Sequence, residues 1–434
     1  MLIHHLTRFI LLFTFFGCSS GKSIGQQKNL PGDHSPAAVE QSRILPGAGR
    51  TEVYVPLLKN KKVGVFANQT SMVGNTHLVD TLRKLGVNIT VIFGPEHGFR
   101  GTADAGEKIG NYTDDRTGIP VISLYGSKRR PSAEDLANVD IMIYDIQDVG
   151  VRFYTFISSL QEYMESAFQN SKPLLILDRP NPNGFYIDGP VLELPYRSFV
   201  GMQPVPVVYG MTMGEYAMMI AGEKWLSDQA NARHDYYRTA ENSRDTPFHF
   251  LVIKCGNYTH QSKYELPVKT SPNLPEMQSV YWYPSTCYFE GTILSEGRGT
   301  PIPFQVFGHP SLPNNLASFT PVSTDGAKDP KLKNQLCYGW NVSGTKEEVL
   351  RRIDAHIQIS YLLNAYKLFP EKDKFFLLAK SGKKEDHFFN KLAGNSTLME
   401  QIIAGKSATE IRKSWEPGLT KFKAIRKKYL LYAD

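Results

Sequence analysis

Three glutamates in this 434-residue chain, Glu96, Glu290 and Glu296, lie in predicted loops flanked by glycine and could carry acid–base chemistry. Glu96 lies in the segment Gly-Pro-Glu-His-Gly-Phe-Arg-Gly at 94–101, and Glu290 and Glu296 are each followed by glycine. Glycine adopts backbone angles that other residues resist, so such loops can present a neighbouring side chain. Glycoside hydrolysis needs two carboxyl groups at the scissile bond, one as acid and one as nucleophile or base. The glutamates therefore indicate this chemistry, although a loop salt bridge is the alternative for each acid taken alone.

Three arginines, Arg100, Arg152 and Arg298, accompany these acids in or near the same loops. A guanidinium group binds a carboxylate through two parallel hydrogen bonds. The arginines therefore suit a substrate that itself carries an acidic group.

Other chemistries are weaker in this sequence. A divalent metal could be held by His97 with Asp145, Asp148 and Asp178, but no His-x-His, His-Glu-x-x-His or cysteine-pair motif is present. Gly-x-Ser-x-Gly occurs only within 17–25, before the first predicted strand, which disfavours a serine nucleophile elbow. The first predicted strand is not followed by a nucleotide-binding glycine motif. We therefore expect no metal, no cofactor and no nucleic acid partner.

The elements that must position these residues alternate between strands and helices. Strands are predicted at 62–68, 87–93, 119–124, 139–144 and 173–177, with further strands at 204–209 and 248–255. Helices are predicted at 76–85, after Ser132, at 154–168 and at 212–225, then from 345 to 362 and, as two shorter helices, from 397 and 407. Continuous apolar strands favour a parallel sheet covered on both faces. The predicted fold class is α/β, with a Rossmann-like parallel sheet domain and a smaller α+β C-terminal domain.

Polar side chains gather where the predicted strands end. The carboxyl ends of parallel strands meet at one edge of a sheet, which is where ligands bind in open α/β folds. A polar surface without function would place such residues at both edges equally. The concentration at one edge therefore predicts a site formed by Asn68, Glu96, His97, Asp145, Asp148, Arg152, Asp178, Arg179 and Asn181.

The N-terminus has the pattern of an export signal. A slightly basic start is followed by an apolar run at 9–16, too short to cross a bilayer, and then by Gly17 and Cys18. This pattern predicts a lipoprotein signal peptide at 1–17 with Cys18 as the lipidated residue, and a cleaved secretory signal is the alternative. We expect a flexible tether at 18–50, a Rossmann-like domain at 51–265 and the smaller domain at 266–434.

Composition agrees with an exported globular protein. Hydrophobic residues make up 41% and charged residues 21%, the net charge is +7, and the length allows two or three domains. Besides Cys18 only Cys255, Cys287 and Cys337 remain, so a disulfide scaffold is excluded. The predicted location is the periplasmic face of a membrane, with the outer membrane favoured.

Several long motifs occur in an order that resembles the exo-β-N-acetylmuramidases of glycoside hydrolase family 171. The resemblance extends from about residue 51 to the C-terminus. The motifs that carry it lie at 94–101, 145–154, 178–182, 271–275, 289–292 and 294–300. Small departures are Ser285, where glycine is expected, and Pro301 with Ile302, which replace a more polar pair.

The resemblance implies release of terminal N-acetylmuramic acid from the non-reducing end of peptidoglycan fragments, at a cleft between the two domains. Glu96 matches the family's proposed catalytic acid, and either Glu290 or Glu296 would be its partner. The lactyl carboxylate of muramic acid would suit an arginine fork. The substrate-binding residues that we expect are His97, Arg100, Asp148, Arg152, Tyr154, Asn181, Asn273 and Arg298. The main alternative is a non-catalytic lipoprotein that binds muropeptides, and the sequence leaves open whether the anomeric configuration is retained or inverted.

Overall fold

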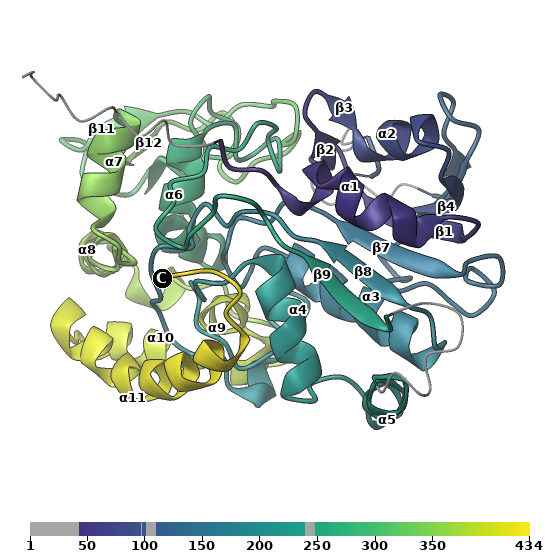
Figure 1. Ribbon diagram of the computed structural model, residues 1–434. Coiled ribbons are helices and arrows are strands. Elements are labelled where there is room, and N and C mark those ends of the chain that lie inside the picture. Colours follow the sequence, from purple (N-terminus) through teal and green to yellow (C-terminus); the bar gives the residue numbers. More distant parts are fainter. Residues whose placement is uncertain (1–42, 97, 101–109, 239–247) are drawn as a thin grey trace, which may run out of the picture. The chain divides into compact units, whose positions relative to one another are not determined.

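A seven-stranded sheet with the order β5-β6-β4-β1-β7-β8-β9 forms the centre of the N-terminal domain (Figure 1). The structure is a computed structural model and describes residues 43–96, 98–100, 110–238 and 248–434. The strands of this sheet are β1 (Lys62–Ala67), β4 (Asn88–Gly94), β5 (Tyr112–Thr113), β6 (Pro120–Ser123), β7 (Ile141–Asp145), β8 (Leu174–Leu177) and β9 (Phe250–Ile253). All neighbouring pairs are parallel except β5 with β6. The predicted parallel sheet is confirmed.

The strand order reverses between β1 and β7. The chain runs outward from β1 through β4 to β6, and then returns to β7 on the other side of β1. In open α/β sheets the crevice at such a reversal, outside the carboxyl ends of the strands, is the usual ligand site. The loops that follow β1, β4 and β7 therefore stand where a ligand is expected.

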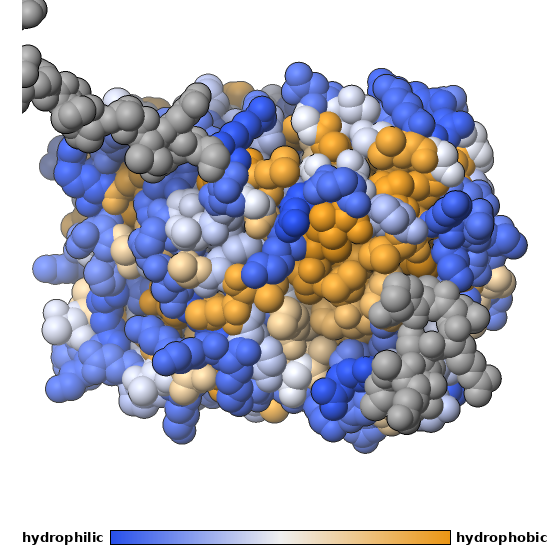
Figure 2. Space-filling view, viewed as in Figure 1, coloured by the Kyte–Doolittle hydropathy of each residue, from blue (hydrophilic) through white to orange (hydrophobic). Residues whose placement is uncertain are grey.

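Helices cover both faces of the sheet. Helices α3 (Phe156–Gln169) and α4 (Met213–Gly222) share one core with Phe66 of β1, whereas α2 (Leu78–Lys84) and Tyr54 of α1 (Thr51–Tyr54) share another core with Val65. Successive side chains of β1 thus enter opposite layers, as the period of a strand requires. Figure 2 shows apolar side chains gathered over β8 and β9 near α1. Helix α5 (Asp228–Tyr237) packs beside α3.

Two local predictions in this domain were wrong. The segment after Ser132 forms turns instead of a helix. Ser132 and Asp135 form the hydrogen bonds of a capping box, but Ala137 N and Val139 N donate to carbonyls only three residues back, Glu134 O and Leu136 O, so no α-helix continues from it. The segment 204–209 is not a strand, and Val208 makes only isolated bridges to Val151 and Asp188.

The C-terminal domain is smaller and combines helices with a three-stranded antiparallel sheet. The sheet has the order β10-β12-β11, with β10 (Val306–His309), β11 (Ala317–Phe319) and β12 (Cys337–Asn341). Its helices are α6 (Met277–Thr286), η5 (Cys287–Gly291), α7 (Lys346–Ile353), α8 (Ser360–Leu368), α9 (Phe388–Ala393), α10 (Thr397–Ile403) and α11 (Ala408–Arg426). This arrangement confirms the α+β expectation.

The helices at the C-terminal end depart from their predicted lengths. The single helix expected from 345 to 362 is divided into α7 and α8, because Asp354 adopts a left-handed conformation with φ of 46° at the end of α7. Helix α11 is longer than predicted and continues through Pro417. Its first turn is held by a capping box between Ser407 and Glu410.

The loop that follows β7 joins the cores of the two domains. Ile146 packs in the core of the sheet, but Val149, Val151 and Phe153 belong to the core of the C-terminal domain. Between them, Arg152 is fully buried and its guanidinium donates to Leu392 O of α9 at 2.8 Å. The backbone that leaves the sheet at this point is therefore held by both domains.

The N-terminal segment is ordered earlier than expected. Leu45 N and Gly47 N donate to Gly256 O and Asp178 O, at 3.0 and 2.7 Å, so the predicted tether ends before residue 45. Residues 1–42, with the predicted signal peptide and Cys18, lie outside the described residues. Among the residues that the structure describes, no helix is long and apolar enough to cross a membrane.

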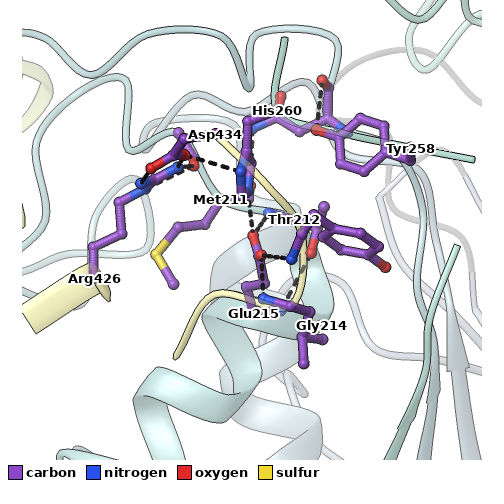
Figure 3. Close-up of polar contacts among 12 residues, drawn as sticks. Met211, Thr212, Gly214, Glu215, Tyr258, His260, Arg426 and Asp434 are labelled. Atoms are coloured by element: carbon purple, nitrogen blue, oxygen red, sulfur yellow. Dashed lines mark hydrogen bonds and ion pairs between the residues drawn. The ribbon is translucent and has the colours of Figure 1, made fainter. Parts of the chain in front are cut away.

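A buried polar cluster fastens the C-terminal segment to the first domain (Figure 3). Glu215 of α4 accepts from His260 Nε2 at 2.8 Å and from Leu431 N at 2.7 Å. The other ring nitrogen of His260 lies 3.0 Å from Asp434 Oδ1, and Asp434 also pairs with Arg426. The carboxylates of Glu215 and Asp434 thus have partners within the protein, and the cluster links the C-terminal segment to the first domain.

Candidate functional site

Glu96 stands at the carboxyl end of β4, partly exposed, in the loop that the sequence singled out. Thr155 Oγ1, from the loop after β7, lies 3.5 Å from Glu96 Oε2. Tyr125, just past β6, also places its hydroxyl against this carboxylate, and burial together with the charge of Glu96 raises the pKa of Tyr125 to about 12. The loops that follow three strands of the sheet, β4, β6 and β7, thus bring polar groups to one point, as the parallel arrangement predicts.

Glu290 and Glu296 are brought together by Arg298. Arg298 Nη2 contacts Glu290 Oε1 at 2.7 Å, and Arg298 Nε lies 3.4 Å from Glu296 Oε1. Lys331 Nζ lies 2.8 Å from the second oxygen of Glu296 and also binds three backbone carbonyls of the same loop. The side chain of Glu290 is 18% exposed, whereas that of Glu296 is 3% exposed. Glu290 is therefore the acid of this pair that a substrate can approach.

Tyr154 connects the Glu96 side of the site with the Glu290 side. Its ring packs edge-on against Tyr283 of α6, with ring centroids 5.9 Å apart. Tyr283 in turn packs on Phe304, and Arg298 lies 5.2 Å from the centroid of that ring. Burial raises the pKa of Tyr154, the charge of Glu96 raises it further, and Arg298 opposes the shift. Half-buried Tyr154 is thus close enough to both Glu96 and Arg298 for their charges to affect its pKa.

Two predicted substrate-binding residues are buried among protein groups. Arg152 is fully buried and donates to the carbonyls of Pro190, Val205 and Leu392. Asp148 is 4% exposed and accepts from Tyr209 Oη at 2.5 Å. In this conformation Arg152 cannot touch a sugar, and it acts instead to hold the loop on which Tyr154 stands.

The two predicted asparagines also bind backbone groups. Asn181 donates to Met211 O at 2.8 Å and packs so closely on Gly150 that a Cβ there would lie 2.0 Å from Asn181 Oδ1. Gly150 has φ of +77°, which strains any other residue. Asn273 donates to Gly326 O at 2.8 Å. Both asparagines are nearly fully buried, so their geometry is that of residues that position loops.

Arg100 lies beside a cavity next to the Glu96 loop. The cavity has a volume of about 840 Å³, and its lining includes Gln69, His77, Arg100 and Asp114. Arg100 forms a two-bond pair with Asp114, at 3.0 and 2.8 Å, and a longer contact to Asp80. The guanidinium is therefore already paired with acids of its own domain. His97, the neighbouring prediction, lies outside the described residues.

The alternative of a metal site gains no support from the acids at the strand ends. Asp145 forms a buried two-bond pair with Arg179, at 2.5 and 2.8 Å. Asp178 accepts from Thr212, Gly214 and Tyr432, and burial raises its pKa to about 6. Among the described residues, which exclude His97, no group of three metal-ligating side chains is present.

Asp148 predicts a measurable pH dependence of stability. Burial raises its pKa to about 7, so the folded protein keeps a proton that the unfolded chain loses above about pH 4. The contribution of Asp148 to stability is complete below that pH and is lost as the pH rises toward 7. Asp148→Asn keeps an acceptor oxygen for Tyr209 and Gly150 but carries no charge. We expect its free energy of unfolding, relative to wild type, to rise by about 1.4 kcal/mol for each pH unit across this range.

Urea denaturation at about pH 4 and about pH 8 measures this difference. Asp178 titrates in the same range but is present in both proteins, so its effect cancels. A constant difference between the two proteins at both pH values would show that Asp148 ionises normally in the folded state.

Four residues at the site were not selected from the sequence. Tyr125 and Thr155 contact Glu96, Tyr283 packs against Tyr154, and Lys331 pairs with Glu296. The position of Tyr125 directly after a predicted strand is a signal that could have identified it. Tyr283 and Lys331 carry no such signal, because they join the site only through the packing of the second domain.

Comparisons with known proteins agree with this arrangement of two domains. The sequence profile described as "Exo-beta-N-acetylmuramidase NamZ, N-terminal" matches residues 63–278, and the profile "Exo-beta-N-acetylmuramidase NamZ, C-terminal" matches residues 281–432. A curated relative, the peptidoglycan beta-N-acetylmuramidase NamZ of Bacillus subtilis (strain 168), is 36% identical over 402 residues, which are 87% of this chain and 89% of the relative.

Two solved structures share the fold. Both are DUF1343 family proteins from Bacteroides fragilis NCTC 9343. The first is 43% identical, has a TM-score of 0.78 and covers 91% of this chain and 100% of its own. The second is 28% identical, has a TM-score of 0.70 and covers 90% of this chain and 99% of its own.

Proposed function

Because the chain belongs to the exo-β-N-acetylmuramidase NamZ family, and so to the peptidoglycan glycoside hydrolases, we propose that it releases N-acetylmuramic acid from the non-reducing end of peptidoglycan fragments. Support comes from the partly exposed polar side chains where the two domains meet. Glu96, Tyr154 and Thr155 come from the loops of the parallel sheet. Glu290 and Arg298 come from the C-terminal domain. A sugar bound among them would have acids on both sides of its glycosidic bond.

In this proposal Glu96 protonates the leaving oxygen of the glycosidic bond. Its loop is partly exposed, and the two hydroxyl groups beside it can orient the carboxyl group. Glu290 is the partner carboxylate, acting as nucleophile or as base for water, because it is more exposed than Glu296. Glu296, held between Arg298 and Lys331, positions the guanidinium. This division of roles, in which one carboxyl group donates a proton and the other acts as nucleophile or base, is the general pattern of glycoside hydrolysis.

The decisive experiment compares two purified disaccharides. One has N-acetylmuramic acid at the non-reducing end, and the other has N-acetylglucosamine there. Mass spectrometry should detect free N-acetylmuramic acid from the first substrate and no cleavage of the second. Equal cleavage of both would contradict the terminal specificity, and the absence of any product over long incubation would favour a protein that only binds muropeptides.

The same reaction followed by ¹H NMR identifies the mechanism. The anomer that forms first shows whether configuration is retained or inverted. A retained configuration implies carboxyl groups about 5 to 5.5 Å apart and a covalent intermediate on the partner acid. An inverted configuration implies roughly 6.5 to 9.5 Å and direct attack by water.

We also propose that Cys18 carries a lipid that anchors the protein at the periplasmic face of a membrane. The support is the short apolar run followed by Gly17 and Cys18 in the sequence. Cys18→Ser should move the protein from the membrane fraction to the soluble fraction. Mass spectrometry of the mature N-terminal peptide should show acyl chains on Cys18, and an unmodified mature chain starting elsewhere would contradict the anchor.

A further inference from the structure

The register of the central sheet places Tyr125 beside Glu96. In the parallel pair β4 and β6, Gly94 stands opposite Ser123, and Leu124 N donates to Gly94 O at 2.8 Å. Glu96 and Tyr125 therefore each stand two residues beyond a paired position on adjacent strands. Parallel strands carry such positions to the same edge of a sheet. The two side chains are therefore neighbours because of the strand register.

A second hydroxyl group approaches Glu96 from the other side. Thr155 follows Tyr154 in the loop after β7 and is half-buried, as is Tyr125. Its Oγ1 lies 3.5 Å from Glu96 Oε2. The hydroxyl of Tyr125 donates a hydrogen bond to the same carboxylate. Glu96 is therefore flanked by donors from the two strands that lie on either side of β4 and β1 in the sheet.

We propose that Tyr125 and Thr155 are positioning residues that hold the Glu96 carboxyl group in the orientation needed for proton transfer. The proposal rests on the proposed role of Glu96 as general acid. A carboxyl group on a loop rotates freely, and a proton is transferred efficiently only from a well-oriented oxygen. The two hydroxyl groups restrict that rotation and so limit the directions in which the carboxyl group can face the glycosidic oxygen.

The same contacts predict different effects on the two kinetic constants. The hydroxyl groups orient the carboxyl group for the transition state and do not hold the substrate, so their loss should lower kcat and leave KM nearly unchanged. A residue that only supports the fold would change stability without this selective loss of kcat.

The test uses hydroxyl-deleting substitutions that keep the shape of each side chain. Tyr125→Phe and Thr155→Val each remove one donor, and Thr155→Ser restores a hydroxyl group. We expect kcat on the disaccharide with terminal N-acetylmuramic acid to fall by about 10- to 100-fold in Tyr125→Phe, with KM within about twofold of wild type. The fall in kcat should be smaller in Thr155→Val, and Thr155→Ser should keep a kcat close to that of wild type.

The matched control is Tyr366→Phe. Tyr366 lies on α8 and packs on Phe375 and Phe376 in the C-terminal domain. This substitution removes the same phenolic hydroxyl group away from Glu96, so kcat and KM should match wild type. Thermal unfolding of each variant shows whether the fold is intact.

Combining Tyr125→Phe with Glu96→Gln tests the positioning role separately from the proposed function on which it rests. In a Glu96→Gln background, Tyr125→Phe should cause little further loss, because the group that it orients is no longer an acid. If wild type cleaves, Glu96→Gln lowers kcat as expected and Tyr125→Phe retains the wild-type kcat, the positioning role is refuted while the proposed function stands. If Glu96→Gln keeps wild-type turnover, the assignment of Glu96 fails and the positioning role falls with it.

Discussion

Glu96→Gln is expected to lower kcat for the disaccharide with terminal N-acetylmuramic acid by about 10²- to 10⁴-fold. Glutamine has nearly the same shape and can still accept from Thr155, but it cannot give a proton to the leaving oxygen. Substrate binding should change little, since the lost interaction is made in the transition state. Initial rates over a range of substrate concentrations measure both constants.

The leaving group provides an internal check on this role. A sugar alkoxide is a poor leaving group that needs the proton, whereas a nitrophenolate needs it far less. The loss caused by Glu96→Gln should therefore be much smaller for a nitrophenyl glycoside of N-acetylmuramic acid than for the disaccharide. An equal loss on both substrates would identify Glu96 as something other than the acid. Glu416→Gln, which removes an exposed carboxylate on α11, is the matched control and should behave as wild type.

Arg298→Met is expected to abolish most activity and also to destabilise the fold by roughly 2 to 4 kcal/mol. The guanidinium separates Glu290 from Glu296, and its side chain is only 26% exposed. Without it, two partly desolvated carboxylates face each other, and within the described part of the chain Lys331 remains as a cation beside Glu296 alone. Since the repulsion displaces the partner acid, kcat should fall by at least about 10²-fold.

A second substitution distinguishes the two effects of Arg298→Met. The double variant Arg298→Met with Glu290→Gln removes the uncompensated charge, so much of the lost stability should return while activity stays absent. Urea denaturation and turnover, measured on the same samples, test both parts. If the double variant is no more stable than the single one, charge compensation is not what Arg298 supplies. Arg351→Met, an exposed arginine on α7, is the control for loss of a surface charge.

The edge of the sheet that carries the site was predictable because its signals are local. Continuous apolar runs such as 88–93 are buried strands, and a strand must end where Gly94 and Pro95 interrupt the pattern. Parallel order then places the following loops at one edge. Glu96 was identified in this way, since its position depends on the end of one strand and on nothing distant.

The roles of the arginines could not be predicted in the same way. Arg152 and Arg298 both lie within sequence motifs. The residue types around each arginine are equally compatible with an arginine that binds a substrate carboxylate and with one that binds protein groups. The structure places Arg152 among backbone carbonyls of both domains and Arg298 between two glutamates. For Arg152 the partner depends on a distant segment, because Leu392 is 240 residues away and no local pattern contains that information. Arg298 pairs with acids of its own loop, Glu290 and Glu296, but the residue types alone do not show whether it binds them or a substrate.

Residue order along the chain was enough to predict the fold class and the polar edge at which Glu96 stands, because hydrophobic periodicity and strand termination act over a few neighbours. Contact between distant segments was needed to show that Glu290 is more open than Glu296, that Asn181 and Asn273 fasten loops, and that Tyr125 and Thr155 flank Glu96. Exposure and orientation arise when separate layers pack together, and this packing determines which of the polar groups at the edge can face a sugar.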